Sequence, residues 1–256
     1  MLVDYSSSEE EPEDDTDQKN AISPSTKVKN AKKLPSAVEL LGSITKSAHE
    51  DVPEDHEGRI RSFAHERGNW ATFCFIPFPL SEGIKNLQAH IRVLAKENLS
   101  LDLTEAKELH VSLTKTVVLR HHWIESFIAS LQHRLQHCRK FPLHLNALQI
   151  YCNEEKTRTF IGLRTSEEFF EHLKILVQKC DESLKEFNLE CFYSDLSFHA
   201  SILWILGDHR EDLRGLESAV QKHFLELLGE KFPDFATRVE KIVCKCGNKM
   251  HYFHIS

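Results

Sequence analysis

Two short segments of the chain share a pattern in which apolar residues alternate with histidine and serine. The first is Leu109-His110-Val111-Ser112-Leu113-Thr114, and the second is Phe198-His199-Ala200-Ser201-Ile202-Leu203. In a β-strand successive side chains point to opposite faces, so a histidine and a serine two residues apart share one face while the apolar residues share the other. The pattern therefore predicts two half-buried strands, each of which presents one imidazole and one hydroxyl group.

If the two strands lie side by side, His110, Ser112, His199 and Ser201 converge on one pocket. Histidine has an unperturbed pKa close to neutral, so two imidazoles can serve together as a general base and a general acid. The implied reaction is cleavage of a phosphodiester without a metal ion. One histidine removes the proton of a ribose 2′-hydroxyl, the other protonates the departing 5′-oxygen, and the serines hold the phosphate. A single His-x-Ser segment is common in structural strands, so this interpretation depends on the presence of both copies.

The composition indicates a folded protein with free thiols. The chain has 256 residues, of which 41% are hydrophobic, and this is enough for one large domain or two small lobes. The seven cysteines are odd in number and scattered, which favours buried thiols in a reducing intracellular compartment over a disulfide framework. No apolar run reaches the length of a membrane span, so we expect no membrane association.

The charge is distributed unevenly along the chain. Residues 1–58 carry a net charge of −8, and the remainder carries +1. A segment so acidic and so poor in aromatic residues cannot bury enough apolar surface to fold, so we predict a disordered acidic tail at 1–58 and one folded domain at 59–256. Four lysines between residues 27 and 33 fit either a nuclear import signal or a solvated charged run.

The remaining pattern predicts an α+β fold. We expect it to be bilobal, with two antiparallel sheets facing each other across a central cleft, helices on the outside and a pseudo-twofold relation between the halves. The expected strands are 71–76, 108–118, 142–151, 158–164, 197–206, 238–246 and 249–255, and the expected helices are 81–98, 124–135, 166–187 and 211–228.

Two clusters contain potential metal ligands, and neither is expected to bind metal. One comprises His121, His122, His133 and His137, and it lacks the glutamate of a helical zinc motif. The other comprises Cys244, Cys246, His251 and His254. Its cysteines are only two positions apart, closer than in zinc knuckles, and strand alternation puts its histidines on opposite faces. We therefore predict surface histidines, buried cysteines and no cofactor.

Longer blocks of the sequence carry a specific resemblance. The paired histidine motifs resemble the 2H phosphoesterase superfamily. Over essentially all of residues 59–256, the chain also resembles the U6 snRNA phosphodiesterase family. This resemblance rests on FAHERGNWAT at 63–72, VVLRHHWI at 117–124, NEEKTRTFIGL at 153–163 and EFNLECFYSDLSFHASILWILGD at 186–208.

The resemblance implies a nuclear, metal-independent 3′-to-5′ RNA exonuclease. The implied substrate is the single-stranded, uridine-rich 3′ tail of U6 snRNA, and trimming would leave a terminal 2′,3′-cyclic phosphate. The resemblance further implies that His110 and His199 are catalytic, that Ser112 and Ser201 bind the phosphate, and that Tyr193 stacks on a nucleotide base. We expect a monomer, and the sequence indicates no protein partner.

One position departs from the family pattern, and two other functions stay open. The family has proline between the aspartate and serine before the second histidine, where this chain has Leu196, so we expect a less rigid loop around Tyr193. A 2′,3′-cyclic phosphodiesterase would need the same four residues. A non-catalytic RNA-binding module is the alternative from another class, and the presence of two intact motifs argues against it.

Overall fold

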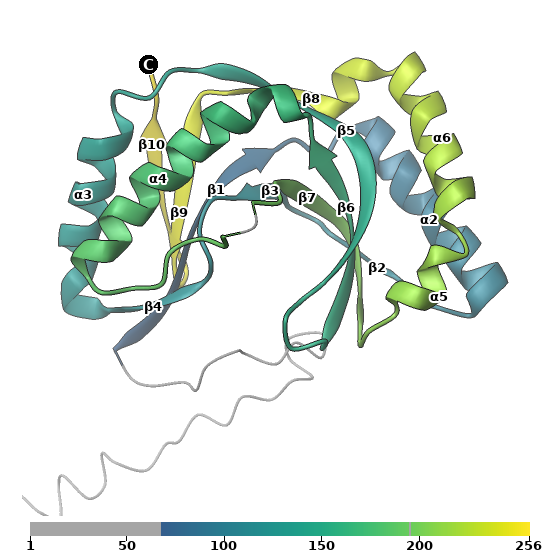
Figure 1. The fold of residues 1–256 in the computed structure, drawn as a ribbon, viewed down its shortest axis with the longest axis horizontal. Helices are drawn as coiled ribbons and strands as arrows, with labels where there is room; N and C mark the ends of the chain where they lie inside the picture. The colour runs from purple at the N-terminus through teal and green to yellow at the C-terminus, as the bar shows by residue number, and fades with distance from the viewer. Residues whose placement is uncertain (1–67, 195) are drawn as a thin grey trace, which may run out of the picture. The chain divides into compact units, whose positions relative to one another are not determined.

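Ten strands form one antiparallel sheet in the part of the chain that the structure describes, residues 68–194 and 196–256 of a computed structural model (Figure 1). The predicted tail at 1–58 lies outside the described residues. The strands are β1 Asn69–Phe78, β2 Thr104–Glu105, β3 Leu109–Ser112, β4 Val117–Arg120, β5 Phe141–Cys152, β6 Arg158–Thr165, β7 His199–Leu206, β8 Ala236–Val239, β9 Lys241–Cys246 and β10 Lys249–His254. The helices are α2 Glu82–Leu99, α3 Ile124–Leu135, α4 Phe170–Glu186, α5 Arg210–Arg214 and α6 Glu217–Glu230, with short 3-10 turns η2 His121–Trp123, η3 Glu167–Phe169 and η4 Phe232–Phe235.

The strand order shows how the two halves of the chain are joined. It is β10-β9-β1-β3-β7-β6-β5-β8, with β2 added beside β7 and β4 beside β1. The α+β class is as predicted, but the expectation of two separate sheets facing each other is wrong. The reason is that the two histidine strands, β3 and β7, pair directly with each other, and this pairing merges both halves into a single curved sheet.

The helices cover the outer side of this sheet in two groups (Figure 1). Helices α3 and α4 pack against each other over the end that contains β1, β9 and β10, whereas α2, α5 and α6 cover the end that contains β5, β6 and β7. None of the helices formed by the described residues lies on the concave side between the two groups (Figure 1). These helices therefore leave one face of β3 and β7 uncovered.

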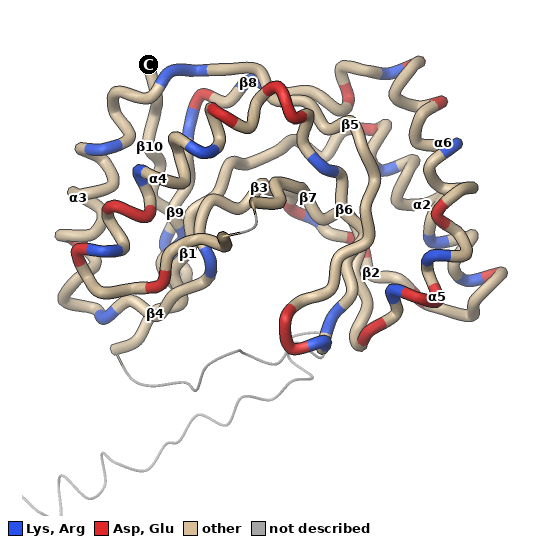
Figure 2. The backbone as a smooth tube through the Cα atoms, in the orientation of Figure 1, with Lys and Arg blue, Asp and Glu red and all other residues tan. Residues whose placement is uncertain are grey.

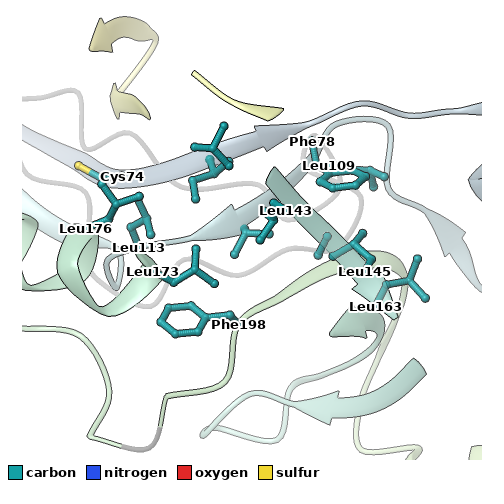
Figure 3. Close-up of a cluster of buried hydrophobic side chains, with 14 of the residues drawn as sticks. Cys74, Phe78, Leu109, Leu113, Leu143, Leu145, Leu163, Leu173, Leu176 and Phe198 are labelled. Atoms are coloured by element: carbon teal, nitrogen blue, oxygen red, sulfur yellow. The ribbon is translucent and has the colours of Figure 1, made fainter. Parts of the chain in front are cut away.

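Burial follows the alternation that the sequence predicts. In β3, Leu109 and Val111 are buried while the histidine and serine are half-buried, and β7 begins with the same alternation. The apolar faces of both strands join one core. Figure 3 shows Leu173 and Leu176 of α4 beside Cys74 and Leu113 in that core. Complete burial of a leucine or phenylalanine side chain stabilises a fold by about 1.5–3 kcal/mol, so these apolar faces fix which side of each strand carries the polar residues.

Helix α2 begins as predicted and ties the central strands together. Ser81 is its N-cap and accepts a hydrogen bond from the Ile84 amide at 3.3 Å. The buried Gln88 side chain of this helix donates to the carbonyl oxygens of Ala106 at 3.1 Å and Ile202 at 2.8 Å. A glutamine buried among apolar residues is stable only when its amide is satisfied in this way. These bonds hold β7 in place beside the segment that leads into β3.

Three predicted elements are divided in the structure. The expected strand 108–118 is interrupted after Ser112, because the Thr114 hydroxyl turns inward and accepts a hydrogen bond from the Cys74 amide at 2.8 Å. The expected strand 238–246 becomes β8, which pairs with β5, and β9, which pairs with β1, with Glu240 between them. The expected helix 211–228 is divided into α5 and α6 at Gly215 and Leu216.

Most charged residues lie on the helices and on the hairpin between β5 and β6 (Figure 2).

No helix among residues 68–194 and 196–256 combines the length and apolar character needed to cross a membrane.

Candidate active site

The pairing of β3 with β7 brings the two predicted motifs together. The paired residues are Val111 and Ala200, and both are completely buried. Extending this antiparallel register by one residue in each direction places His110 opposite Ser201 and Ser112 opposite His199. Directly opposite residues in a sheet point to the same face. All four polar side chains therefore lie on the uncovered concave face, and each histidine is adjacent to the serine of the other motif.

His199 is held in a defined orientation by its own strand. Its Nδ1 atom lies 3.1 Å from the backbone carbonyl oxygen of Ser197. A carbonyl can only accept a hydrogen bond, so Nδ1 carries the proton and the lone pair of Nε2 is free. Burial lowers the pKa of His199 to about 4, and repulsion from His110 acts in the same direction, against the hydrogen bond to Ser197. His199 is therefore neutral at pH 7 and suited to accept a proton.

Tyr151 of β5 stacks on His199 from the side of β6. The two ring centroids lie 3.7 Å apart and the ring planes differ by 15°. The Ser197 hydroxyl donates toward the Tyr151 hydroxyl oxygen at 3.5 Å. Gly162 makes this stack possible, because a Cβ atom there would lie 3.0 Å from Tyr151 Cε2 and 3.1 Å from His199 Cδ2. Neither Tyr151 nor Gly162 can be identified from the sequence, since nothing local to β5 or β6 shows that they lie beside β7.

His110 has different neighbours. Its ring centroid lies 5.1 Å from that of Phe75 and 6.0 Å from that of Phe73, both on β1. Burial lowers the pKa of His110. Hydrogen bonding to the backbone of Glu108 and the negative charge of Glu108 act against this shift, while Lys245 acts in the same direction as burial. Each histidine thus interacts with the backbone of the residue two positions before it, and among residues 68–194 and 196–256 only His110 also has a nearby carboxylate.

Tyr193 lies in the segment that leads into β7, and its side chain is 44% exposed. The ammonium group of Lys115 lies 4.4 Å from the centre of its ring, and the same group is 3.8 Å from a carboxylate oxygen of Glu190. The Phe192 amide donates to Asp181 Oδ1 at 2.9 Å, which ties this segment to α4. An exposed aromatic ring held in this way can accept a planar base. Lys115 comes three residues after Ser112, and nothing in the sequence pattern distinguishes it.

Leu196, the position that departs from the family pattern, packs against the hydrophobic core as a partly buried side chain. Apolar packing therefore holds residue 196 at the position where a proline ring would restrict the backbone.

The two clusters of potential metal ligands are not assembled. Cys244 and Cys246 are buried with their sulfur atoms 3.8 Å apart. His121 and His122 are exposed at η2. Within residues 68–194 and 196–256, no three His, Cys, Asp or Glu side chains are grouped so that they could hold a metal ion.

Comparison with known proteins identifies the family. A family profile described as "HVSL: Uncharacterised conserved protein" matches residues 32–254, and its name matches the residues at 110–113 of this chain. U6 snRNA phosphodiesterase 1 of Xenopus laevis is 45% identical over 206 residues, covering 78% of this chain and 80% of that protein. The Drosophila melanogaster protein of the same name is 36% identical over 258 residues, covering 97% of this chain and 96% of its own. The chain belongs to the U6 snRNA phosphodiesterase 1 family.

The fold agrees with this family assignment. Usb1 of Kluyveromyces marxianus, in a structure with uridine monophosphate, superimposes with a TM-score of 0.56 at 15% identity, covering 73% of this chain and 98% of that one. At this level of identity the match shows a shared fold. The family and the fold both confirm the resemblance that the sequence blocks at 63–72, 117–124, 153–163 and 186–208 carry.

Proposed function

We propose that this protein is a 3′-to-5′ RNA exonuclease that trims the uridine-rich 3′ tail of U6 snRNA by metal-independent transesterification, leaving a terminal 2′,3′-cyclic phosphate. The observation that carries the proposal is the convergence of His110, Ser112, His199 and Ser201 on one uncovered face, in a chain whose relatives are U6 snRNA phosphodiesterases. Two imidazoles and two hydroxyls around one phosphate supply both proton transfers and the contacts to the phosphate oxygens.

The geometry favours a division of roles between the histidines. His199 has the free Nε2 lone pair and the pKa of about 4, so it accepts the proton of the penultimate 2′-hydroxyl. His110, beside the Glu108 carboxylate, donates a proton to the departing 5′-oxygen. A bound phosphodiester carries a negative charge, which raises the pKa of both imidazoles and helps His110 to hold its proton at neutral pH. The hydroxyl groups of Ser112 and Ser201 donate to the phosphate oxygens as charge builds on them.

Tyr193 supports the proposal at the terminal nucleotide. Its exposed ring offers a stacking surface, and stacking by itself does not select a base. The Kluyveromyces marxianus relative holds uridine monophosphate, which is consistent with a uridine at the end of the substrate.

The arrangement of the motifs also supports the predicted pseudo-twofold symmetry between the two halves of the domain. An antiparallel pair of strands has a local twofold axis, and an axis between Val111 and Ala200 exchanges His110 with His199 and Ser112 with Ser201. We propose that the two halves of the domain, 59–256, are related by this axis. We further propose that the protein is a nuclear monomer that acts on the free single-stranded 3′ end of RNA.

The test is incubation of the protein with 5′-labelled oligouridylate in excess EDTA, followed by analysis of the new ends. The proposal expects stepwise shortening and a cyclic phosphate that acid converts to a monophosphate. A 2′-deoxy substitution at the penultimate nucleotide should block the first cleavage, whereas the same substitution at the terminal nucleotide should not.

Three results would contradict the proposal, and each points elsewhere. Loss of activity in EDTA with recovery on adding zinc or magnesium would indicate a metal enzyme. A monophosphate end from the start, or hydrolysis of added cyclic phosphate only, would indicate a cyclic phosphodiesterase. Binding of oligouridylate without shortening would indicate an RNA-binding module.

A further inference from the structure

A row of side chains extends the candidate active site across three more strands. Ser112 of β3 is opposite Phe75 of β1, Phe75 is opposite Val243 of β9, and Val243 is opposite Tyr252 of β10. Because directly opposite residues share a face, Phe75 and Tyr252 lie on the same concave face as the two histidines. Neighbouring strands are about 4.8 Å apart, so the row from β3 to β10 is about 14 Å long.

A second row beside it adds a positive charge. Phe73 is opposite Lys245, and Lys245 is opposite Met250. The Phe73 and Phe75 rings stack on each other with their centroids 5.3 Å apart. Lys245 is half-buried, makes no ion pair among the described residues, and is close enough to His110 to lower its pKa. The concave face over β1 and β9 therefore carries the ammonium group of Lys245, which forms no ion pair with a described residue, beside the stacked rings of Phe73 and Phe75.

The outer end of the surface is open to solvent. Tyr252 is 56% exposed and Met250 is 37% exposed. The ammonium group of Lys241 lies 5.5 Å from the centre of the Tyr252 ring. An exposed aromatic ring next to a cation lies at each end of the candidate site, here and at Tyr193 with Lys115. Folding alone gives no reason to leave a tyrosine more than half exposed on an uncovered sheet face.

We propose that Phe73, Phe75, Lys245 and Tyr252, the β1–β10 aromatic face, bind the RNA nucleotides on the 5′ side of the cleaved bond. This inference rests on the proposed exonuclease function. Aromatic rings that stack on bases, combined with ammonium groups that contact phosphates, are the pattern by which proteins bind single-stranded nucleic acid.

The occupant follows from the chemistry of the substrate. The terminal nucleotide has no chain beyond its 3′ end, so all other RNA lies on the 5′ side of the cleaved bond. Tyr193 accounts for the terminal base. The β1–β10 aromatic face continues the row that starts at His199, the proposed base at the penultimate 2′-hydroxyl, because His199 is opposite Ser112 and Ser112 is opposite Phe75. Stacking and phosphate contacts are independent of sequence, so this subsite would increase affinity for a longer strand without selecting its bases.

The test compares a diuridylate with a hexauridylate as substrates. The diuridylate has no nucleotide that reaches Tyr252. In wild-type protein, kcat/KM should rise from the shorter substrate to the longer one. Tyr252→Ala and Lys245→Ala should each lower kcat/KM on hexauridylate about fivefold or more, while Tyr252→Ala should leave the rate on diuridylate within about twofold of wild type. Lys245→Ala should also reduce the slope of log affinity against log salt by about 0.7, the value for one lost phosphate contact on a single strand.

Lys249→Ala is the matched control. Lys249 is on the same hairpin and carries the same charge, but it is opposite Cys246 and therefore lies on the other face of the sheet. Its substitution should leave both substrates unaffected. Tyr252→Phe keeps the ring and should keep the wild-type preference for the longer strand. Thermal unfolding of each variant shows whether the fold is retained.

Three outcomes would overturn the inference. The first is an equal loss for Lys249→Ala and Lys245→Ala, which would indicate a general effect of charge. The second is an equal loss on diuridylate and hexauridylate, which would place these residues at the terminal nucleotide. The third is unchanged activity in folded variants, which would leave this face to another molecule such as a protein. Fluorescence anisotropy with a penultimate 2′-deoxy hexauridylate measures binding alone. It therefore tests the subsite even if the wild-type protein cleaves nothing, the result that would defeat the proposed function.

Discussion

The His110 half and the His199 half of the site share a sequence motif but differ in what surrounds the imidazole. Each histidine interacts with the backbone of the residue two positions before it. His199 is stacked under Tyr151, has no carboxylate beside it in the described part of the chain, and has its pKa lowered to about 4. His110 lies against two phenylalanines and beside the Glu108 carboxylate. The motif supplies two equivalent groups, and the neighbouring strands make them different enough to act as base and acid.

The largest expected effect comes from removing either imidazole. His110→Ala and His199→Ala should each lower kcat on oligouridylate by about 10²–10⁴-fold, the usual contribution of a general acid or base. The double variant should lose little beyond the worse single variant, because both groups act on one step. Single-turnover rates with labelled RNA measure this. A His199→Ala protein that trims at a near-normal rate would contradict the assignment of His199 as the base and of His110 as the acid.

The serines should matter less and about equally. Ser112→Ala and Ser201→Ala each remove one donor to the phosphate, which costs about 10²–10³-fold in kcat when charge builds on an oxygen. RNA affinity should fall less than the rate, because these bonds are strongest in the transition state. Parallel measurement of kcat and of binding separates the two effects. An equal loss in affinity and rate would mean that the serines bind the substrate and the transition state equally well.

The aromatic stack on His199 provides the next test of the comparison. Tyr151→Leu removes a ring contact of about 0.5–1.5 kcal/mol, so kcat should fall roughly two- to tenfold, and the pKa of His199 should rise as its surroundings become wetter. Tyr151→Phe keeps the ring and should behave nearly as wild type. NMR titration of the His199 ring checks the shift. If Tyr151→Leu changed the rate without changing the pKa of His199, the stacked tyrosine would not be what sets that pKa.

The pH profile sharpens the comparison further. A base must be neutral, so kcat/KM should fall as the pH drops toward the pKa of His199, about 4. An acid must be protonated, so kcat/KM should also fall as the pH rises through the pKa of His110, which burial lowers below its usual 6.5. The profile of kcat should shift to higher pH, because bound phosphate raises both pKa values. A kcat/KM profile that keeps rising above pH 8 would contradict this order of pKa values.

The sequence predicted the two strands because their alternation is local. Val111 and Ala200 had to be buried, so His110 and His199 had to face the other way. It could not predict that one sheet forms, because the pairing of β3 with β7 joins residues about 90 positions apart and leaves no local pattern.

The supporting residues were missed for the same reason. Tyr151 reaches His199 only because β5, β6 and β7 are neighbours in the sheet, and Gly162 is needed only once that stack exists. Lys115 contacts Tyr193 across two segments that are distant in sequence. The motif residues can therefore be read from the sequence, whereas the residues that give each histidine its role require the strand order.

The most direct test of the two roles uses an RNA whose departing 5′-oxygen is replaced by sulfur. A thiolate leaves without being protonated, so cleavage of this substrate needs the base but not the acid. The account predicts that His110→Ala cleaves the 5′-thio substrate at close to the wild-type rate, whereas His199→Ala stays as slow as on normal RNA. Recovery of His199→Ala with no recovery of His110→Ala would reverse the assignment and contradict the account.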